Sequence, residues 1–403
     1  MKSKITLTIA LILTVRASAE DATQFRGAGG LGLSKETKLP IEWSATEGIR
    51  WKAELPGKGL SNPVIANGRV YVSATQAYQQ KRQVVLCFDV KTGKKLWERQ
   101  VWGTGTTLCH PKTNMAAPTP ITDGERVYAL FATGDFVCYD KEGDLVWYRS
   151  IVGDYPTVGN NVGMAASPTI AGDVILLCME NVGESFAAGI DKNTGENRWR
   201  IDRPRGINWV SPLVTKNADQ TEVLFYGPDG LAAHDPNTGK KKWSEPTVKV
   251  WAYASLTYDN GIVYAPGDKF MALRPGSGKA EPSVLWQSPK LRAPYCSPIV
   301  HNNRLYVVNG NGVLNCADTK NGDVIWSQRV EGPFAASPLL ADGKLYVVNE
   351  KGVTTVIAEG GKEANVLATN TIDDTFLACP VAADGAIFLR SDAALYCIDG
   401  KKK

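Results

Sequence analysis

The chain has 403 residues, of which 43% are hydrophobic and 21% are charged, and its formal net charge is +4. Three of the positive charges, Lys2, Lys4 and Arg16, lie in the first nineteen residues, so the remainder is close to neutral. A near-neutral chain lacks the basic surface of a nucleic-acid-binding protein, and we expect no nucleic-acid partner. The length is ample for a large hydrophobic core.

The first nineteen residues have the pattern of a cleaved signal peptide. Lys2 and Lys4 precede an apolar stretch, residues 5–15, that is too short to span a bilayer, and residues 17–19 (Ala-Ser-Ala) fit a cleavage site. An uncleaved anchor is the alternative, because Arg16 is an awkward charge beside the apolar stretch. We expect a periplasmic or secreted monomer with no transmembrane segment in the mature chain.

A short phrase ending in tryptophan recurs along the rest of the chain. Its copies, which combine Asp, a Gly turn and Trp to different degrees, span residues 89–97, 140–147, 191–199, 235–243, 274–286 and 318–326. A period of roughly 40 to 50 residues is typical of a propeller or a solenoid. We expect the glycine to take a positive φ, the aspartate to accept backbone N–H bonds, and the tryptophan to pack against a neighbouring unit.

Each unit begins with a small residue before proline, followed by alternating strands and tight turns such as Asn67-Gly68. Eight such steps occur, at Pro63, Pro118, Pro168, Pro212, the variant Ala254-Ser255-Leu256, Pro298, Pro338 and Pro380. Eight units of four antiparallel strands predict an all-β, eight-bladed β-propeller. The seventh unit is degenerate, with Val366 or Leu367 at the expected tryptophan position.

The last unit stops at Asp399-Gly400 without its tryptophan strand, and residues 48–55 have the pattern of the missing strand. Pairing of this N-terminal strand with the last blade would close the ring and leave no long open edge. The expected organisation is therefore a signal peptide at residues 1–19, an N-terminal wrap at residues 20–42 and a single propeller at residues 43–400. The tryptophans expected to dock the blades are Trp51, Trp97, Trp147, Trp199, Trp243, Trp286 and Trp326.

Tryptophan-docked units of this pattern resemble the PQQ-like (quinoprotein) β-propeller superfamily. The resemblance covers roughly residues 43 to 399 and is specific, because turn, glycine and tryptophan recur together. The superfamily includes pyrroloquinoline-quinone alcohol dehydrogenases and the propeller lipoprotein of the outer-membrane β-barrel assembly machine. The chain has neither the vicinal cysteines of the dehydrogenases, nor a Cys-x-x-Cys-His haem signature, nor a lipidated cysteine after the expected cleavage site. The resemblance therefore implies the fold more firmly than the function.

Cysteines and histidines add little evidence of chemistry. Four of the eight cysteines (Cys87, Cys138, Cys316 and Cys397) share one repeat position, where other units have Gly189, Ala233 and Ala272. A position that accepts such small residues predicts buried free thiols. We expect His234 and His301 on the surface, and no metal at Cys109 and His110, which lack further ligands. Residues 27–32 match G-x-G-x-x-G without the flanking strand and helix of a nucleotide site.

The loops that lead into the small-Pro steps are the candidate binding region, because in a propeller they gather around the channel on one face. The candidate ligand or partner residues are Trp209, Asn208, Trp251, Tyr253, Tyr295, Phe334, Phe376, His110, Asn114, Asn160, Asn161, Arg205 and Arg292. Aromatic side chains with a few convergent polar groups indicate a pocket for a small ligand or a peptide. The alternative is that the aromatic side chains only plug the channel.

No serine–histidine–aspartate or paired-carboxylate constellation can be assigned from spacing, so we predict no catalytic residues. The function expected is an exported, non-catalytic scaffold that binds a protein, a peptide or a small ligand in the cell envelope, without a cofactor. The alternative is an oxidoreductase that uses pyrroloquinoline quinone with calcium to oxidise an alcohol or a sugar. A hydrolase or lyase is a third possibility for which the sequence shows no residues.

Overall fold

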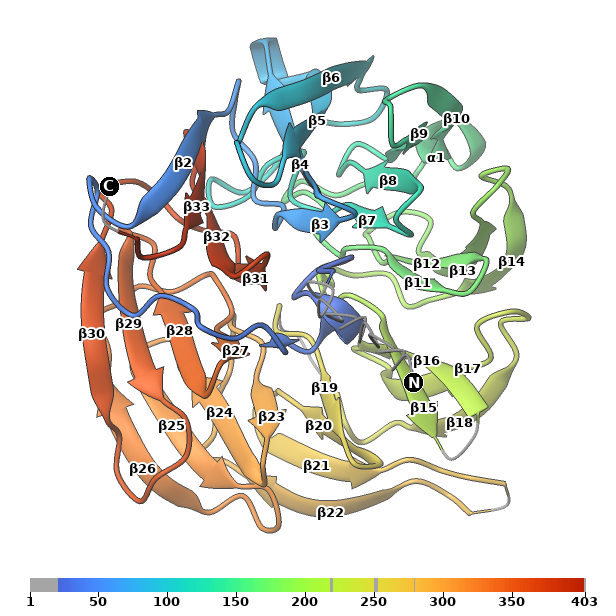
Figure 1. The fold of residues 1–403 in the computed structure, drawn as a ribbon. Helices are drawn as coiled ribbons and strands as arrows, with labels where there is room; N and C mark the ends of the chain where they lie inside the picture. The colour runs from blue at the N-terminus through green and yellow to red at the C-terminus, as the bar shows by residue number, and fades with distance from the viewer. Residues whose placement is uncertain (1–20, 218–219, 250–252, 279, 402–403) are drawn as a thin grey trace, which may run out of the picture.

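The computed structural model describes residues 21–217, 220–249, 253–278 and 280–401. The predicted signal peptide and Trp251 lie outside the described residues. In the part of the chain that is described, eight antiparallel four-stranded sheets surround a central axis (Figure 1). The prediction of an all-β, eight-bladed propeller is confirmed, with one addition, a fifth strand that joins one sheet in parallel.

The first four blades follow one another in chain order, each running from its innermost strand to its outermost. Blade 1 contains β3 (Val64–Ala66), β4 (Arg69–Gln76), β5 (Arg82–Asp89) and β6 (Lys95–Trp102), and blade 2 contains β7 (Ile121–Thr122), β8 (Arg126–Leu130), β9 (Asp135–Asp140) and β10 (Leu145–Ser150). Blade 3 contains β11 (Thr169–Ala171), β12 (Val174–Met179), β13 (Phe186–Asp191) and β14 (Asn197–Asp202), and blade 4 contains β15 (Leu213–Asn217), β16 (Gln220–Gly227), β17 (Gly230–His234) and β18 (Lys241–Glu245).

The other four blades complete the ring, and the last two include strands from the N-terminal region. Blade 5 contains β19 (Thr257–Asp259), β20 (Ile262–Ala265), β21 (Phe270–Arg274) and β22 (Ser283–Ser288), and blade 6 contains β23 (Ile299–His301), β24 (Arg304–Val308), β25 (Val313–Asp318) and β26 (Val324–Arg329). Blade 7 contains β1 (Leu33–Ser34), β27 (Leu339–Ala341), β28 (Lys344–Val348), β29 (Val353–Ala358) and β30 (Val366–Thr371), and blade 8 contains β31 (Val381–Ala383), β32 (Ala386–Arg390), β33 (Ala394–Ile398) and β2 (Ile49–Glu54).

The ring closes by pairing strand β2 with strand β33, as the sequence predicted. Figure 1 shows β2 beside β33, and in this antiparallel ladder Trp51 lies opposite Cys397 and Glu54 lies opposite Ala394. Blade 8 is therefore built from both ends of the chain, which ties the N-terminal region to the last strand and satisfies that strand's outer edge.

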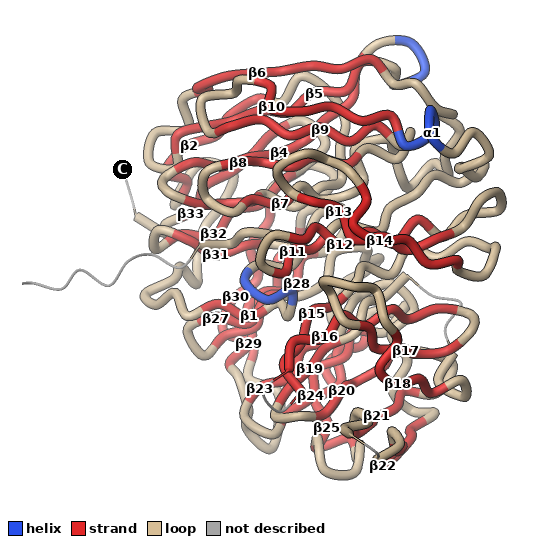
Figure 2. Tube along the Cα trace, turned by 90° about the vertical axis from the view of Figure 1, so that its right-hand side faces the viewer, coloured by secondary structure: helices blue, strands red, loops and turns tan. Residues whose placement is uncertain are grey.

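Helical structure is minimal among the described residues. It consists of α1 (Ile151–Asp154) and the two short 3₁₀ turns η1 (Ala28–Gly30) and η2 (Tyr78–Gln80) (Figure 2). The side chain of Ser150 caps α1 by accepting a hydrogen bond from the Gly153 N–H. None of these segments has the length and apolar character that a membrane-crossing helix requires.

The repeat tryptophans lie between neighbouring blades. Six of the seven donate their indole N–H to a backbone carbonyl in the next blade, over 2.8–3.0 Å. For five of these six, the accepting residue directly follows the repeat aspartate, as Lys141 follows Asp140 for Trp97. Trp243 is the exception and donates to the Glu222 carboxylate of its own blade over 3.1 Å; the next unit has Arg274 at the aspartate position.

The glycine of each turn does more than supply a positive φ. Gly93, at φ +68°, lies flat on the Trp51 ring, so that a Cβ built there would be 2.5 Å from the indole. Gly143, Gly195, Gly239 and Gly322 contact the tryptophan of the preceding blade in the same way. The glycine therefore meets two requirements, a left-handed backbone and close approach of a large ring.

The register corrects the prediction for blade 7. Ala368 pairs with Val356 as Trp326 pairs with Cys316 in the blade before, so Ala368 occupies the tryptophan position. Val366 and Leu367 lie just before it on the exposed edge strand. The expectation was wrong because the irregular turn between β29 and β30 changes the number of residues between the two strands.

A second connection joins the blades at the axis. In each blade the small residue of the step donates its backbone N–H to the side chain of the equivalent residue in the next blade, over 2.8–3.2 Å. The eight residues of this hub ring are Asn62, Thr119, Ser167, Ser211, Ser255, Ser297, Ser337 and Cys379. Cys379 donates to Asn62, which closes the circuit.

The hub ring also corrects the assignment of the second step. Thr119, not Ala117, makes the equivalent bonds, so the proline of that step is Pro120 rather than Pro118. The sequence Pro118-Thr119-Pro120 offers two prolines, and only the bond partners distinguish them.

Residues 21–34, called the plug below, cross the axis of the ring (Figure 1). Ala22 exchanges two backbone bonds with Ile65 of blade 1, and the Leu340 N–H of blade 7 donates to Gly32. Arg26 is buried at the centre, where its guanidinium donates to the carbonyls of Leu256 (3.4 Å) and Pro298 (2.5 Å). Burial lowers the pKa of Arg26 to about 10, because desolvation penalises the charged form.

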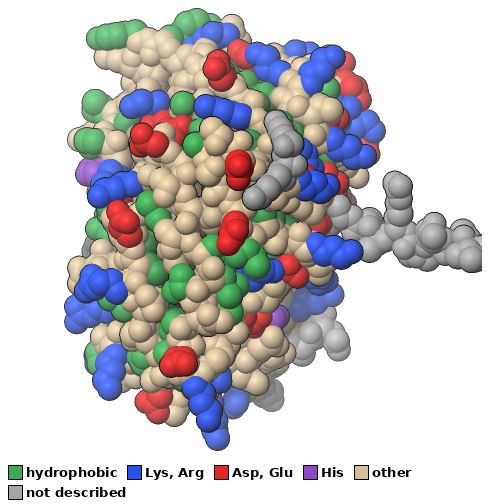
Figure 3. Space-filling view, turned by 60° about the vertical axis from the view of Figure 1, so that its left-hand side comes forward, with side chains coloured by type: hydrophobic (Ala, Val, Ile, Leu, Met, Phe, Trp, Pro, Cys, Tyr) green, Lys and Arg blue, Asp and Glu red, His purple; other side chains and the backbone are tan. Residues whose placement is uncertain are grey.

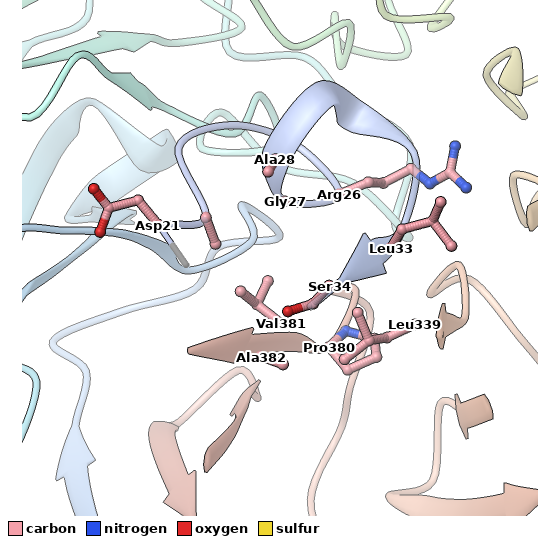
Figure 4. A pocket seen from close by; sticks show the side chains of 11 residues that line it. Asp21, Arg26, Gly27, Ala28, Leu33, Ser34, Leu339, Pro380, Val381 and Ala382 are labelled. Atoms are coloured by element: carbon pink, nitrogen blue, oxygen red, sulfur yellow. The ribbon is translucent and has the colours of Figure 1, made fainter. Parts of the chain in front are cut away.

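After the plug, the chain runs towards the rim and then forms strand β2. Figure 4 shows its contact with Leu339, Pro380 and Val381 of blades 7 and 8, with the Arg26 side chain extending away from Asp21. Further along, the Tyr346 hydroxyl donates to the Pro40 carbonyl and the backbone N–H of Trp43 donates to Oδ1 of Asn370. The N-terminal region is thus fixed to the propeller by specific polar contacts.

Two expectations about single residues can be compared with the structure. All eight cysteines are free thiols, and the four in the shared repeat position are buried as expected. His234 is buried, not on the surface as the sequence suggested, with its ring 2.9 Å from the Gly239 carbonyl and edge-on to Phe225. Desolvation lowers its pKa. His234 is the last residue of β17 and its side chain packs on Phe225. In the sequence it adjoins the Asp235 turn, and a turn position predicts an exposed side chain.

Candidate functional site

A cavity of about 480 Å³, called the axial cavity below, lies at the mouth of the channel. Residues from all eight blades line it, and none of them lies in a strand. The hub ring contributes seven of the lining residues (Asn62, Thr119, Ser167, Ser211, Ser297, Ser337 and Cys379). Phe25 of the plug lines the cavity as well. Its volume falls within the roughly 300 to 1,000 Å³ of small-ligand sites.

Four aromatic side chains from consecutive blades line one side of the cavity, and we call them the aromatic arc: Trp209, Tyr253, Tyr295 and Phe334. The first three each stand two residues before a hub-ring serine, so the bonds of the hub ring fix the loop from which they project. The Tyr253 and Tyr295 rings are nearly parallel, 8° apart with centroids at 5.6 Å, and Trp209 and Tyr253 are 4.7 Å apart.

The arc is held in place but not covered. The Trp209 indole N–H donates to the Gly163 carbonyl over 3.0 Å, which fixes the ring. Tyr253 and Tyr295 remain 40% and 51% exposed, whereas Phe334 is buried at the end of the arc. Aromatic faces left open to solvent beside a cavity are available to a ligand.

An ion pair spans the other side of the mouth. The Lys112 ammonium lies 2.9 Å from both carboxylate oxygens of Glu350, joining the long loop of blade 2 to the β28–β29 turn of blade 7. His110 is exposed beside it and its Nδ1 accepts a hydrogen bond from the Lys112 N–H. Because the two charges cancel, these groups give the mouth a polar but not a strongly charged wall.

Two buried polar groups in the cavity wall have no hydrogen-bond partner among the described residues: Asn62 Nδ2 and Thr113 Oγ1. Asn62 is 1% exposed, and its Oδ1 accepts the Cys379 N–H, so the amide orientation leaves both Nδ2 protons unpaired. Buried polar groups are usually satisfied, so these two are exceptions within the wall of the cavity.

The structure brings together five of the thirteen residues that the sequence suggested. His110, Trp209, Tyr253, Tyr295 and Phe334 line the axial cavity. Trp251 lies outside the described residues. The other seven do not line it: Asn208, Asn114, Asn160, Asn161, Phe376, Arg205 and Arg292.

The residues that do not line the cavity have other surroundings. Asn208 is buried and donates to Glu180, which also pairs with Arg203 over 2.7 Å. Phe376 is buried against Tyr396 in the core of blades 7 and 8. Asn114 and Asn160 accept backbone N–H bonds within their own loops. Asn161, Arg205 and Arg292 are exposed. Loop position alone did not distinguish side chains that support the loop from those that face the cavity.

The sequence reasoning missed Lys112, Glu350, Asn62 and Thr113. Asn62 could have been found from the sequence, because it is the only asparagine among the eight residues that precede the steps' prolines or Leu256. Its side chain therefore has an amide NH2 that the other seven lack. Lys112 and Glu350 are 238 positions apart, and nothing in the local pattern of either predicts the other. Over the described ranges, no group of three or more His, Cys, Asp or Glu side chains is arranged to hold a metal ion.

The blade topology, the hub ring and the tryptophan layer define an eight-bladed propeller of the PQQ-like class. More particularly, the model of the family described as outer membrane protein assembly factor BamB matches residues 32–199, 112–250 and 272–366. These segments cover more than half of the chain, and the chain belongs to this family.

Two curated relatives carry the same description. One, from Burkholderia pseudomallei, is 25% identical over 224 residues, which are 54% of this chain and 50% of that protein. The other, from Moranella endobia, is 22% identical over 282 residues, which are 67% of this chain and 65% of that protein. The chain thus spans between half and two thirds of the length of these relatives.

Solved structures show the same fold at low identity. BamB from Moraxella catarrhalis superposes with a TM-score of 0.64 at 15% identity, covering 87% of this chain and 96% of that one. Quinohemoprotein alcohol dehydrogenase from Comamonas testosteroni gives a TM-score of 0.70 at 12% identity, covering 95% and 81%. BamB and an alcohol dehydrogenase are both represented at low identity, so the likeness establishes the fold and leaves function to the site.

Proposed function

We propose that this chain is an exported, non-catalytic propeller scaffold of the cell envelope that binds a ligand or a partner at the mouth of its channel. The observation that carries the proposal is the open aromatic arc beside the axial cavity. Side chains that only plugged a channel would be buried, whereas Tyr253 and Tyr295 are 40% and 51% exposed. Family membership supports a scaffold, because the relatives are described as assembly factors.

The setting proposed for this function is the periplasm or the cell exterior. A near-neutral chain that begins with a signal-peptide pattern fits that setting, as do relatives whose description places them in outer-membrane assembly. The proposed partner is a protein or peptide of the envelope or a small ligand, and the proposed state is a monomer. Figure 3 shows basic and acidic side chains interspersed over one face of the molecule, a pattern that suits a soluble surface.

The alternative, an oxidoreductase using pyrroloquinoline quinone and calcium, fits the residues of the axial cavity poorly. Calcium takes six to eight oxygen ligands and in proteins depends on carboxylates. Among the described residues that line the cavity, Glu350 is the one that carries a carboxylate, and the Lys112 ammonium lies 2.9 Å from both of its oxygens. Titrating the purified chain with the quinone and calcium tests this alternative, and saturable binding followed by alcohol-dependent dye reduction would establish it.

Partner capture tests the scaffold proposal. The mature chain carrying Trp209→Ala and Tyr295→Ala is immobilised and exposed to an envelope extract, beside the unsubstituted chain. A control carries Trp102→Ala and Tyr78→Ala, which remove aromatic side chains that are 60% and 83% exposed and do not line the cavity. We expect one or more captured species to be lost from the cavity variant and retained by the control. Identical capture by all three proteins would contradict the proposal.

A further inference from the structure

We infer that the axial cavity binds a small neutral saccharide of one or two rings. The inference rests on the proposed function, because it names the class of ligand for the same site. It is carried by four features of the cavity: open aromatic faces, a ring of spare hydroxyl donors, an unpaired buried amide, and balanced charge.

The aromatic arc offers the surface on which sugar rings pack. The Tyr253 and Tyr295 rings stack on each other, nearly parallel at 8° with centroids 5.6 Å apart, and Trp209 packs on Tyr253 at a 40° tilt. A sugar ring would pack on the open part of this stack, at Tyr295, which is 51% exposed. The face of an aromatic ring is electron-rich, and one face of a pyranose presents C–H groups that are apolar and slightly positive. Rings fixed in advance lose little conformational freedom when a flat ligand stacks on them.

The hub ring supplies hydrogen-bond donors in the wall of the same cavity. Thr119, Ser167, Ser211 and Ser297 line the cavity, and the hydroxyl oxygen of each accepts one backbone N–H from the preceding blade. A hydroxyl group that accepts one bond still has its own O–H to donate and a further lone pair. These groups match a ligand whose hydroxyls both donate and accept.

Asn62 is the strongest single indication of a ligand. Its side chain is buried in the cavity wall, its Oδ1 is committed to the Cys379 N–H, and its Nδ2 has no partner among the described residues. Thr113 Oγ1 is a second buried group in the same wall without a partner in the described chain. An acceptor oxygen of a ligand would satisfy Asn62, and a sugar hydroxyl would satisfy either group.

Charge and wall structure distinguish a saccharide from other occupants. The Lys112–Glu350 pair is neutral as a unit, so it gives the wall no net charge that would favour a charged ligand. A polyol can accept from the ammonium group and donate to the carboxylate without breaking the pair. An extended peptide that binds by strand addition needs a strand edge, and none of the lining residues that the structure describes lies in a strand.

The test is direct binding to the purified mature chain. The probes are glucose, galactose, N-acetylglucosamine, maltose and cellobiose, followed by a glycan array, with titration followed by calorimetry and by tryptophan fluorescence. We expect saturable binding of at least one saccharide, weakened roughly tenfold or more by Tyr295→Ala. Tyr78→Ala, which removes an exposed tyrosine away from the cavity, is expected to leave the affinity unchanged.

A second variant, Asn62→Asp, tests the unpaired amide without opening the hub ring. Aspartate keeps an oxygen for the Cys379 N–H but removes the Nδ2 protons, so we expect weaker saccharide binding with a native circular dichroism spectrum. Saccharide binding that Tyr295→Ala and Asn62→Asp leave unchanged would overturn the placement in this cavity.

The outcomes separate this inference from the proposed function. If no saccharide binds while the Trp209→Ala, Tyr295→Ala variant still loses a captured partner, the saccharide inference is overturned and the scaffold proposal stands. Binding of a peptide library at the same residues, without any saccharide, has the same consequence. If neither saccharide binding nor partner capture depends on the arc, both are overturned.

Discussion

The blades of this propeller are joined twice, by large aromatic residues near the rim and by small polar residues at the axis. At the rim, six tryptophans pack against the turn of the next blade and donate to its carbonyl. At the axis, eight backbone N–H groups donate in one direction around the hub ring. At the rim, neighbouring blades are joined mainly by buried apolar surface. At the axis, they are joined by one hydrogen bond between each pair of blades.

The two layers tolerate change differently. Blade 7 has Ala368 at the tryptophan position, and there Trp43 of the N-terminal segment stacks on Tyr346, as Trp326 packs on Tyr306 in the blade before. Trp43 and Ala368 pack in one hydrophobic cluster, so a ring from a distant segment fills this interface. The axis accepts asparagine, threonine, serine or cysteine, but each buried N–H requires an acceptor, and all eight have one. The rim thus accepts a ring from elsewhere in the chain, and the axis accepts different side chains that each provide an acceptor.

The largest expected effect follows from breaking the rim. Trp97→Ala removes a buried ring that contacts Tyr71 and Tyr139 and donates to the Lys141 carbonyl. We expect a loss of about 3 to 5 kcal/mol in the free energy of unfolding, as for buried aromatic residues in general, measured by urea denaturation. Trp102→Ala, at an exposed site on the same strand, is the control and should change it by less than about 0.5 kcal/mol. Equal effects of the two would refute a role for the rim.

The turn glycine gives the next effect. Gly93→Ala combines a left-handed φ of +68° with a Cβ 2.5 Å from the Trp51 ring. Gly68 has a similar φ of +76° but nothing within 4 Å of a Cβ, so Gly68→Ala measures the backbone strain alone. We expect Gly93→Ala to cost about 1 to 3 kcal/mol more than Gly68→Ala, the usual penalty of overpacking. Equal thermal shifts for the two variants would show that the tryptophan contact is irrelevant.

A break in the axis should cost less than the loss of a rim tryptophan. Ser297→Ala leaves the buried Ser255 N–H without its acceptor, and we expect a loss of about 1 to 3 kcal/mol of unfolding free energy. Ser297→Thr keeps a hydroxyl, which Thr119 already provides at the equivalent position of blade 2, and should recover most of the stability. Failure of threonine to restore stability would indicate that space, not the acceptor, limits this position.

The smallest effect concerns His234, which is buried at the end of strand β17. Its pKa is lowered by desolvation and further by Arg203 and Lys241, against the opposing effects of the Gly239 carbonyl and Asp229. Below the ordinary histidine pKa of 6.5, His234 binds a proton in the unfolded chain but not in the folded chain. The free energy of unfolding therefore decreases as the pH is lowered below 6.5. We expect His234→Gln to reduce this fall in the melting temperature, and the exposed His110→Gln to leave it unchanged. A parallel fall in all three proteins would contradict this.

The rim was largely predictable from the sequence because its residues are conspicuous. The Asp-turn, the glycine and the tryptophan recur at a fixed spacing, and together they indicated blade number, strand number and closure by residues 48–55. The failure at Ala368 arose from an irregular turn, where counting along the chain no longer gives the register. His234 was misplaced for a related reason, since a turn signal beside it masked its position on a buried strand.

The axial cavity was predictable only in part. The loops that lead to the small-Pro steps gave Trp209, Tyr253 and Tyr295 correctly as neighbours, because equivalent loops of a ring converge. The same reasoning could not separate them from Asn208, which donates to Glu180 in a buried network. Which side of a loop a side chain occupies depends on packing with other blades, and a local pattern does not contain that information.

The sequence by itself determined the repeat, and with it the eight-bladed ring and its closure, because each blade is a local unit whose hydrophobic faces need a neighbour. Tertiary structure alone decided which distant residues meet at the axis and at the mouth of the channel. It closed the hub ring between Cys379 and Asn62, placed Arg26 at the axis, and paired Lys112 with Glu350 across the mouth. These contacts join residues more than two hundred positions apart, and their energies depend on burial and geometry that exist only once the ring has formed.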